Sequence, residues 1–436
     1  MCTGSNGWTL CPYEWNDQGA DGGYARMNNL KNQNPSLKTL LAVGGWNHGS
    51  TGFVEMASSQ ANIDQFVVNA MNYVNDIGYD GLDLDWEYPA KTTVDTSPPE
   101  DYENFQSVCD ALRTRVDSVQ PGFFLSAAVG IGEDKIYEID NAPPSYNIAN
   151  LMKNMDLVNL MTYDLHGHWE EQTGHHALAH VKQEDDRLGY TDSIEWVLDN
   201  WILLGADPKK LTLGLAGYGR SFKLADSSNN GYMAQCELGW NGLYSGAAGP
   251  YTREGGYLAY YEVCEKLNAG WTSVWDDEGK VPYAHGDGDW VGYDNPDSIQ
   301  YKVEMAKDYG LGGIMWWATD IDDFDGSFCN QGKYPLMTRG KNVWLDGDYM
   351  STTSRPTTQS GASTRTTQSS TGGNTGGCST GEYFPSETDC AKFQLCDNGE
   401  LLDLECSSGL IWDTTSNACN WPSTVDCCNG QRPCNL

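Results

Sequence analysis

The sequence predicts an α/β fold with a parallel sheet, open or closed into a barrel, followed by a small disulfide-rich β module. Three observations support this fold class. Short apolar runs alternate with amphipathic helical stretches over the first 350 residues, as in parallel α/β proteins. A Ser/Thr-rich stretch then fills residues 351–377. Eight of the 14 cysteines lie between Cys378 and Cys434, a density that indicates disulfide staples in a segment too small for a sufficient core.

Six apolar runs are expected to form the strands of the sheet. They are Leu40–Val43, Gly81–Trp86, Phe124–Val129, Leu157–Thr162, Leu211–Ala216 and Gly313–Trp317. Helical patterns lie between them, at Asn62–Ile77, Glu100–Val116, Ser193–Leu203 and Ser298–Tyr309. The interval from Ser221 to Tyr293 interrupts the alternation, and we expect an inserted α+β subdomain at about residues 222–293.

The acidic composition excludes two classes of partner. The net charge is −34 and the pI is near 4.3, which argues against nucleic acid and anionic membranes. No apolar run is long enough to cross a bilayer. No signal peptide is recognisable after Met1, yet the cysteine density implies a secreted, extracellular protein.

The chain is expected to divide into three parts. Residues 1–350 form the large domain. Residues 351–377 contain almost no apolar side chain, so they cannot offset the entropy of ordering and indicate an O-glycosylated linker. Residues 378–436 form the stapled module; zinc is the weaker interpretation there, because the segment contains neither CxxC pairs nor histidine.

The segment from Asp80 to Pro89 carries the strongest chemical signal. In a strand, side chains alternate between faces, so Asp83, Asp85 and Glu87 point the same way. Burial and crowding should raise the pKa of at least one carboxyl, as a general acid requires. Glu87 is nearest the carboxyl end of the strand, where barrel enzymes keep their active sites. We therefore expect Glu87 to be the acid.

This segment resembles the signature of family 18 glycoside hydrolases, the chitinases, in which the last acidic residue is the proton donor. The resemblance extends from about Trp15 to Val343 and implies a TIM (β/α)8-type barrel. The further motifs are Leu40–Asn47 for the third strand, Met161–Asp164 for the sixth, Tyr218–Phe222 for the seventh and Gly312–Trp317 for the eighth.

The resemblance implies a retaining, substrate-assisted hydrolysis of chitin. Glu87 would protonate the glycosidic oxygen, while Asp85 holds the acetamide nitrogen of the sugar. Tyr163 would hydrogen-bond the acetamide oxygen, Asp83 would share a proton with Asp85, and Asp164 would complete the polar floor.

Further residues are assigned to substrate binding by the same resemblance. Trp317 would stack on the distorted sugar, and Trp46 and Trp169 would form platforms on the product side. The remaining motif positions expected to contact substrate are Met161, Tyr218, Arg220 and Met315. The expected ligands are chitin and chito-oligosaccharides, with endo-acting cleavage preferred over exo-acting cleavage.

The cysteines of the C-terminal module resemble those of a peritrophin-type chitin-binding domain. The implied pairs are Cys378–Cys396, Cys390–Cys427 and Cys406–Cys419, although six cysteines allow fifteen connectivities. Trp412 is the aromatic residue favoured for stacking on sugar rings. In the large domain, the resemblance implies a Cys264–Cys329 disulfide, and Cys236 has no family partner.

No metal or other cofactor is expected. His166, His168, His175 and His176 lack the context of a metal site, and a loop over the active site is the preferred interpretation. The acidic run Asp320–Gly326 fails the EF-hand pattern, since Ile321 occupies the first ligand position.

The alternatives are a chitinase-like lectin, a chitin-matrix binding protein and an endoglycosidase of N-glycan cores. We expect a monomer. We also expect that the barrel lacks its first two strands, because only twelve residues precede the family-like segment at Tyr13 and Met1–Pro12 has no apolar run suited to a central strand.

Overall fold

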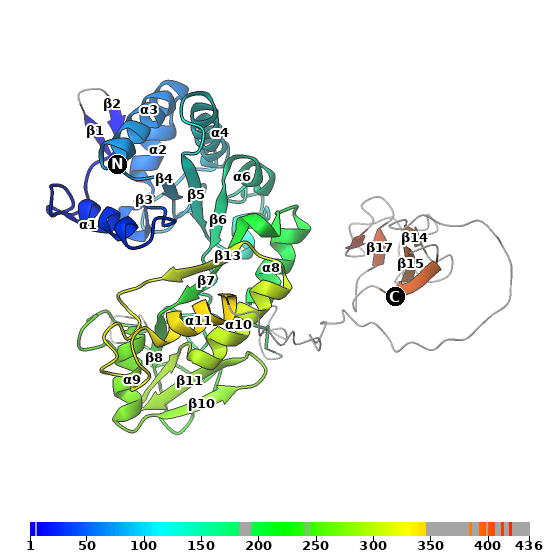
Figure 1. Cartoon of the computed structure of the whole chain (residues 1–436). Helices are drawn as coiled ribbons and strands as arrows, with labels where there is room; N and C mark the ends of the chain where they lie inside the picture. The colour runs from blue at the N-terminus through cyan, green and yellow to red at the C-terminus, as the bar shows by residue number, and fades with distance from the viewer. Residues whose placement is uncertain are drawn as a thin grey trace. The chain divides into compact units, whose positions relative to one another are not determined.

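The computed structural model describes residues 1–4, 7–182, 193–239, 242 and 244–345, together with five short strands near the C-terminus. Two compact units are present, Met1–Ser351 and Thr352–Leu436. The first unit contains a parallel sheet and an antiparallel sheet (Figure 1). None of the helices among these residues is long and apolar enough to span a membrane.

The parallel sheet has six strands in the order β13-β7-β6-β5-β4-β3. Their bounds are β3 Leu40–Gly44, β4 Gly81–Asp85, β5 Phe124–Val129, β6 Leu157–Leu160, β7 Leu211–Ala216 and β13 Gly313–Trp317. Every pairing is parallel. All six expected strands form; β6 is two residues shorter than expected because the chain turns at Met161.

Helices connect the strands, and the longer ones, α3, α4, α8 and α10, each bury one apolar face. They are α1 Gly23–Asn29, α2 Thr51–Ala57, α3 Gln60–Asp76, α4 Asp101–Val119, α5 Glu133–Ile136, α6 Ile148–Asn154, α8 Ile194–Leu203, α9 Tyr260–Asn268, α10 Pro296–Asp308 and α11 Pro335–Leu345. Short 3-10 turns are η1 Leu30–Asn32, η2 Trp46–His48 and η3 Pro208–Lys210. Side-chain caps begin α3 at Ser59, α8 at Ser193 and α10 at Asn295, which satisfies otherwise unpaired backbone N–H groups.

The inserted subdomain is a five-stranded antiparallel sheet in the order β10-β11-β12-β8-β9. The strands are β8 Tyr218–Lys223, β9 Tyr257–Ala259, β10 Thr272–Asp276, β11 Val281–Gly286 and β12 Asp289–Gly292. The sheet begins four residues before the expected boundary. The motif Tyr218–Phe222, which was assigned to the seventh barrel strand, therefore lies on β8 of the antiparallel sheet. The corresponding strand of the parallel sheet is β7.

The N-terminal residues form a hairpin of their own. Strands β1 (Cys2–Gly4) and β2 (Gly7–Thr9) pair antiparallel with each other. The carbonyl of Trp8 accepts a hydrogen bond from Asn69 Nδ2 of α3 at 2.8 Å. Neither strand joins the parallel sheet, which has six strands among the described residues and ends at β3 and β13.

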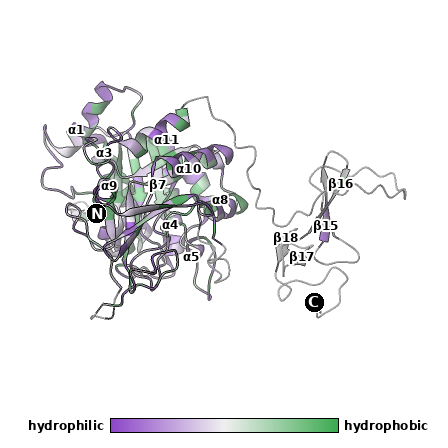
Figure 2. Cartoon of the chain, turned by 90° about the horizontal axis from the view of Figure 1, so that it is seen from below, coloured by the Kyte–Doolittle hydropathy of each residue, from purple (hydrophilic) through white to green (hydrophobic). Residues whose placement is uncertain are grey.

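Hydrophobic residues gather at the centre of the first unit, around β7, and hydrophilic residues lie toward its periphery (Figure 2). All six residues of β7 are buried, because neighbours cover both faces of a central parallel strand. In the second unit, β14 Tyr383–Pro385, β15 Lys392–Asp397 and β16 Glu400–Glu405 form one sheet, and β17 Ile411–Asp413 pairs with β18 Ala418–Asn420.

Candidate active site

Strand β4 presents its carboxylates on one face, as the alternation predicts. Leu82 and Leu84 are each 1% exposed on the helix-covered face. Asp83, Asp85 and Glu87 are only partly covered on the other face. The apolar face anchors the strand, so the carboxylates are held in a row at its carboxyl end.

Asp83 lies deepest in this row and is held by the two strands that follow. Its Oδ1 accepts hydrogen bonds from the Ser126 hydroxyl and from Asn159 Nδ2, the latter at 3.3 Å. Ser126 is the direct register partner of Asp83 on β5, and Asn159 belongs to β6. Thr212 on β7 continues the network by donating to Asn159 Oδ1 at 2.7 Å.

Asp85 and Glu87 meet the turn that follows β3. The Gly45 N–H donates to the backbone carbonyl of Asp85 at 2.7 Å. Gly44 and Gly45 both have positive φ, at 115° and 88°, which only glycine adopts readily. A Cβ on Gly44 would lie 2.0 Å from the Asp85 carbonyl oxygen. This close turn brings the Trp46 backbone N–H to the Glu87 carboxylate.

The row of carboxyls binds protons more tightly than free carboxyls do. Burial raises the pKa of Asp83 to about 6, although Ser126 and Asn159 partly oppose the shift. Burial, and then the nearby Glu87 and Asp83, raise the pKa of Asp85 to about 8. Burial also raises the pKa of Glu87. Desolvation and like charge both favour the neutral form, so the cluster retains protons near neutral pH.

A second charged group lies after β6. Asp164 accepts hydrogen bonds from Tyr218 Oη at 2.8 Å and from Arg220 Nε and Nη2, each at 2.7 Å. Burial alone would raise the pKa of Asp164, but His176 and Arg220 hold it well below its usual value. The bidentate geometry is the strongest form of this ion pair, so Asp164 remains ionised.

Tyr163 lies between the two carboxylate groups. It is 9% exposed and packs in one cluster with Tyr218, Met161 and Met315. Its hydroxyl is 3.8 Å from Met315 Sδ. Burial holds the pKa of Tyr163 well above its usual value, and the nearby carboxylates Asp164, Asp85, Glu87 and Asp83 add to this shift. Tyr163 therefore keeps its proton and can donate a hydrogen bond.

The three tryptophans assigned to substrate binding are unusually exposed for such large side chains. Trp46 and Trp169 are each 51% exposed, and Trp317 is 53% exposed. Trp46 begins η2 directly after β3, and Trp317 ends β13. The Arg220 guanidinium lies 5.5 Å from the Trp169 ring centroid. The carboxyl ends of the sheet strands thus carry exposed aromatic faces, which suit stacking on sugar rings.

Three neighbours of the site were not recognised in the sequence. Ser126 and Asn159 hold Asp83, and Tyr257 stacks on Tyr218 with ring centroids 4.6 Å apart. The register of neighbouring strands could have identified Ser126, since it lies opposite Asp83. Tyr257 belongs to β9, and nothing in its local sequence indicates this contact.

Three of the four histidines in the segment after β6 are buried, whereas His168 is only partly buried. His166, His175 and His176 are 6%, 2% and 0% exposed; His175 Nε2 donates to the Tyr293 carbonyl, and the His176 ring packs against Tyr218 of β8. Across the described ranges, no three His, Cys, Asp or Glu side chains are placed to hold a metal ion. In the acidic run, Asp323 accepts the backbone N–H of Gly326 at 3.0 Å and orders the turn.

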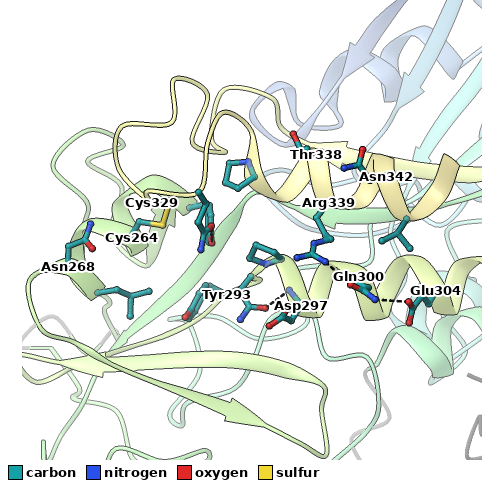
Figure 3. A pocket seen from close by; sticks show the side chains of 17 residues that line it. Cys264, Asn268, Tyr293, Asp297, Gln300, Glu304, Cys329, Thr338, Arg339 and Asn342 are labelled. Carbon is teal, nitrogen blue, oxygen red and sulfur yellow. Dashed lines mark hydrogen bonds between the residues drawn. A yellow bond between two sulfur atoms is a disulfide. The ribbon is translucent and has the colours of Figure 1, made fainter. Parts of the chain in front are cut away.

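The described residues also line a hollow of about 870 Å³ away from the carboxylate row (Figure 3). Residues of α10 and α11 line it, including Gln300 and Arg339, whose Nη1 donates to Gln300 Oε1 at 2.8 Å. The Cys264–Cys329 disulfide closes one end, and this is the pair implied by the resemblance. No residue assigned to catalysis or substrate binding lines this hollow.

Most residues of the module strands are described only as backbone. Trp412 lies on β17 opposite Cys419 of β18. The other expected disulfide partners Cys378, Cys390, Cys406 and Cys427 lie outside the described residues, as does the side chain of Cys396. Cys2, Cys11, Cys109 and Cys236 are free cysteines.

Comparison with known proteins agrees with this arrangement. Residues 6–322 match the family model for glycosyl hydrolases family 18, and residues 378–428 match that for the chitin-binding Peritrophin-A domain. Mouse (Mus musculus) chitotriosidase-1 is 34% identical over 410 residues, covering 91% of this chain and 83% of the relative.

Two solved structures show the same fold. An immunomodulatory active chitinase from Trichuris suis superposes with a TM-score of 0.70 at 34% identity, covering 77% of this chain and 87% of that one. Human YKL-39, described as a pseudo-chitinase with retained chitooligosaccharide binding, gives a TM-score of 0.66 at 33% identity, covering 73% and 84%. The α/β fold is therefore that of TIM-barrel chitinases, and the chain belongs to glycosyl hydrolases family 18.

Proposed function

We propose that this protein hydrolyses the β-1,4-N-acetylglucosamine linkages of chitin by a retaining, substrate-assisted mechanism, with Glu87 as general acid. The observation that carries the proposal is the state of Asp85. Its Oδ1 is buried and has no hydrogen-bond partner within the described part of the chain. A buried acceptor left unpaired is costly, and the acetamide N–H of a bound sugar would satisfy it.

The proposed first step is proton transfer from Glu87 to the glycosidic oxygen. Its raised pKa keeps Glu87 protonated where a free glutamate would be ionised, as a general acid requires. The carbonyl oxygen of the substrate's own acetamide then attacks the anomeric carbon and the glycosidic bond breaks. Asp85 orients the acetamide N–H, and Tyr163 donates to the acetamide oxygen.

The remaining polar residues stabilise this arrangement. Asp83 can take up the proton that Asp85 would otherwise hold. Asp85 is then ionised and can accept the acetamide N–H while positive charge develops on the cyclic intermediate. Asp164 stays ionised beside Arg220 and counters the developing positive charge. Water then opens the cyclic intermediate with Glu87 now acting as base, and the anomeric configuration is retained.

Substrate recognition follows from the exposed aromatic residues and from the second unit. Trp46, Trp169 and Trp317 are proposed to stack on sugar rings, with Met161 and Met315 packed around Tyr163 and Tyr218. The nucleophile belongs to the substrate, so a sugar without an N-acetyl group at the cleavage site should not be cleaved. Residues 378–436 would hold the enzyme on solid chitin, with Trp412 stacking on sugar rings.

We also infer the domain organisation and the location of the protein. Residues 1–350 would be the catalytic domain, 351–377 a linker and 378–436 the binding module. The cysteine density of the module and the Cys264–Cys329 disulfide are compatible with secretion into an oxidising compartment. The protein is proposed to act as a monomer.

A chitin-binding lectin without catalytic activity is the second candidate. The open six-stranded sheet favours it, since a closed barrel has eight strands and each edge strand here has a single neighbour among the described residues. The intact row of Asp83, Asp85 and Glu87 favours hydrolysis.

One experiment separates the two candidates. The purified full-length protein is incubated with colloidal chitin and with cellulose, and the soluble products are followed by proton NMR. Hydrolysis predicts N-acetylated oligosaccharides from chitin with the β-anomer appearing first, and no product from cellulose. Adsorption to chitin without soluble product would favour the lectin, and an initial α-anomer would refute the retaining mechanism.

A further inference from the structure

His176 lies directly behind Asp164 and takes no part in the mechanism above. Its side chain is fully buried, and its Nδ1 is 3.7 Å from Asp164 Oδ1. Neither ring nitrogen of His176 has a hydrogen-bond partner in the portion of the chain that the structure describes. Asp164 is the charged group paired with this buried imidazole, at a distance longer than a direct hydrogen bond, so the position of the ring beside a site carboxylate needs an explanation.

His176 contacts the group that holds Asp164 as well as Asp164 itself. Its ring centroid is 4.9 Å from that of Tyr218, whose hydroxyl donates to the same Asp164 oxygen. The backbone carbonyl of His176 accepts the N–H of Leu165 at 2.9 Å. Asp164 has a φ of 63°, a left-handed conformation that persists only where the surroundings enforce it. His176 therefore supports the strained turn through both its ring and its backbone.

The charged groups around His176 act in opposing directions. Asp164 and Asp294 favour a positive charge on the ring, whereas Lys302 opposes it. Arg220 lies on the far side of Asp164, with which it makes the ion pair. Burial is the largest influence and lowers the pKa of His176, so the ring is uncharged at neutral pH.

The neighbouring His175 cannot serve the same purpose. Its Nε2 donates to the Tyr293 carbonyl at 2.9 Å, and its Nδ1 accepts the Ala177 N–H at 3.0 Å. Both nitrogens are engaged in one neutral tautomer, and a second proton would break the bond to Ala177. Its ring stacks on that of His176 with centroids 5.4 Å apart. His176 is thus the member of this pair with nitrogens available to bind a proton.

We propose that His176 is a positioning residue: its neutral ring keeps Asp164 seated on Arg220 and Tyr218, and proton uptake by the ring at acid pH draws Asp164 away from Arg220. For catalysis this inference rests on the proposed function, because Asp164 is the carboxylate that would counter the charge of the intermediate. A protonated ring 3.7 Å from Asp164 Oδ1 competes directly with the Arg220 Nε–H, which donates to the same oxygen.

The test follows the Arg220 Nε–H by NMR in the full-length protein labelled with ¹⁵N-arginine and ¹⁵N-histidine, from neutral pH down to the lowest pH at which the protein stays folded, because burial lowers the pKa of His176. In the wild type, the Arg220 signal should shift as the His176 ring titrates. In His176→Asn, which cannot take up a proton, the part of the Arg220 shift that follows the His176 titration should be lost, while any shift caused by the carboxylate row, where Asp83 has a pKa of about 6, should remain. The matched control is His180→Asn, a partly buried histidine bound to Glu195 and Tyr301, which should behave as the wild type.

Hydrolysis provides the second readout. The ratio of kcat/KM at pH 5 to that at pH 7 should rise in His176→Asn by about fivefold or more, the lower end of typical coupling between sites. In the wild type, an Arg220 signal that does not follow the His176 titration would overturn the proposal. This measurement does not depend on whether the variant folds. An unchanged pH ratio in a folded His176→Asn would also overturn its catalytic part. If the Arg220 signal follows the His176 titration but the wild-type protein does not hydrolyse chitin, the positioning role is supported and the proposed function is refuted.

Discussion

Replacing Asp83 by asparagine should stabilise the protein while reducing its activity. Asp83 has a raised pKa of about 6 in the fold, against 3.8 in the unfolded chain. A raised carboxyl pKa contributes stability below the unfolded value, and this stability is lost as pH rises from about 3.8 to about 6. The shift corresponds to about 3 kcal/mol, an upper bound because Asp83 and Asp85 titrate together.

Asparagine keeps the contacts of this position without the charge. Its Oδ1 can still accept from Ser126 and from Asn159, as the Asp83 Oδ1 does. The variant should therefore match the wild type at pH 4 and exceed it by up to about 3 kcal/mol at pH 7. Loss of the Asp83 charge also lowers the pKa of Asp85, because Asp83 is one of the groups that raise it.

Urea unfolding at pH 4 and at pH 7 measures the effect, with the midpoint and the slope reported for both proteins. Chitin hydrolysis by the variant should fall by about tenfold or more, because Asp85 loses the neighbour that shares its proton. Equal stabilities of variant and wild type at both pH values would refute the assignment of a buried, proton-binding Asp83. A less stable variant at pH 7 would refute it as well.

Three further predictions concern other parts of the molecule. Lys302→Met should destabilise the fold by about 3–5 kcal/mol, because it removes the cation that lies 2.6 Å from the fully buried Asp294 and leaves that carboxylate with the Ser298 hydroxyl but no opposite charge. The double variant with Asp294→Leu should recover much of this loss in urea unfolding, and a single variant as stable as the wild type would contradict the prediction. Deleting residues 378–436 should weaken adsorption to solid chitin but leave cleavage of short soluble oligomers nearly unchanged, because a tethered module raises local concentration only on a substrate with several sites; equal losses on both substrates would show that the module supports the fold. Non-reducing digestion should recover Cys264 and Cys329 in one linked peptide pair, and free thiols at both positions would contradict this.

The elements of the parallel sheet could be predicted well because their signal is local. The expected bounds of β5, β7 and β13 agree with the structure, since each is a buried apolar run between breakers. β6 was expected to reach Thr162 but ends at Leu160. There the backbone turns, with the Tyr163 N–H bonded to the Met161 carbonyl at 2.8 Å.

The carboxylate row could also be predicted, because period-two alternation places its members on one face. The partners of the row could not, since they depend on register between strands far apart in sequence. Asn159 reaches Asp83 across 76 residues of chain. The burial of His176 depends likewise on residues distant in sequence, such as Tyr218 of β8, and the local sequence around His176 indicates only a loop.

The central claim is that Glu87 donates the proton, and Glu87→Gln tests it most directly. The amide keeps the shape of the side chain but cannot donate an acidic proton, so kcat on chito-oligosaccharides should fall by about 10²–10⁴ while binding of chitin is retained. Glu133→Gln, an exposed position on α5, is the matched control and should keep wild-type turnover. Substantial residual hydrolysis by Glu87→Gln, with the wild-type dependence on pH, would contradict the account and place the acid elsewhere.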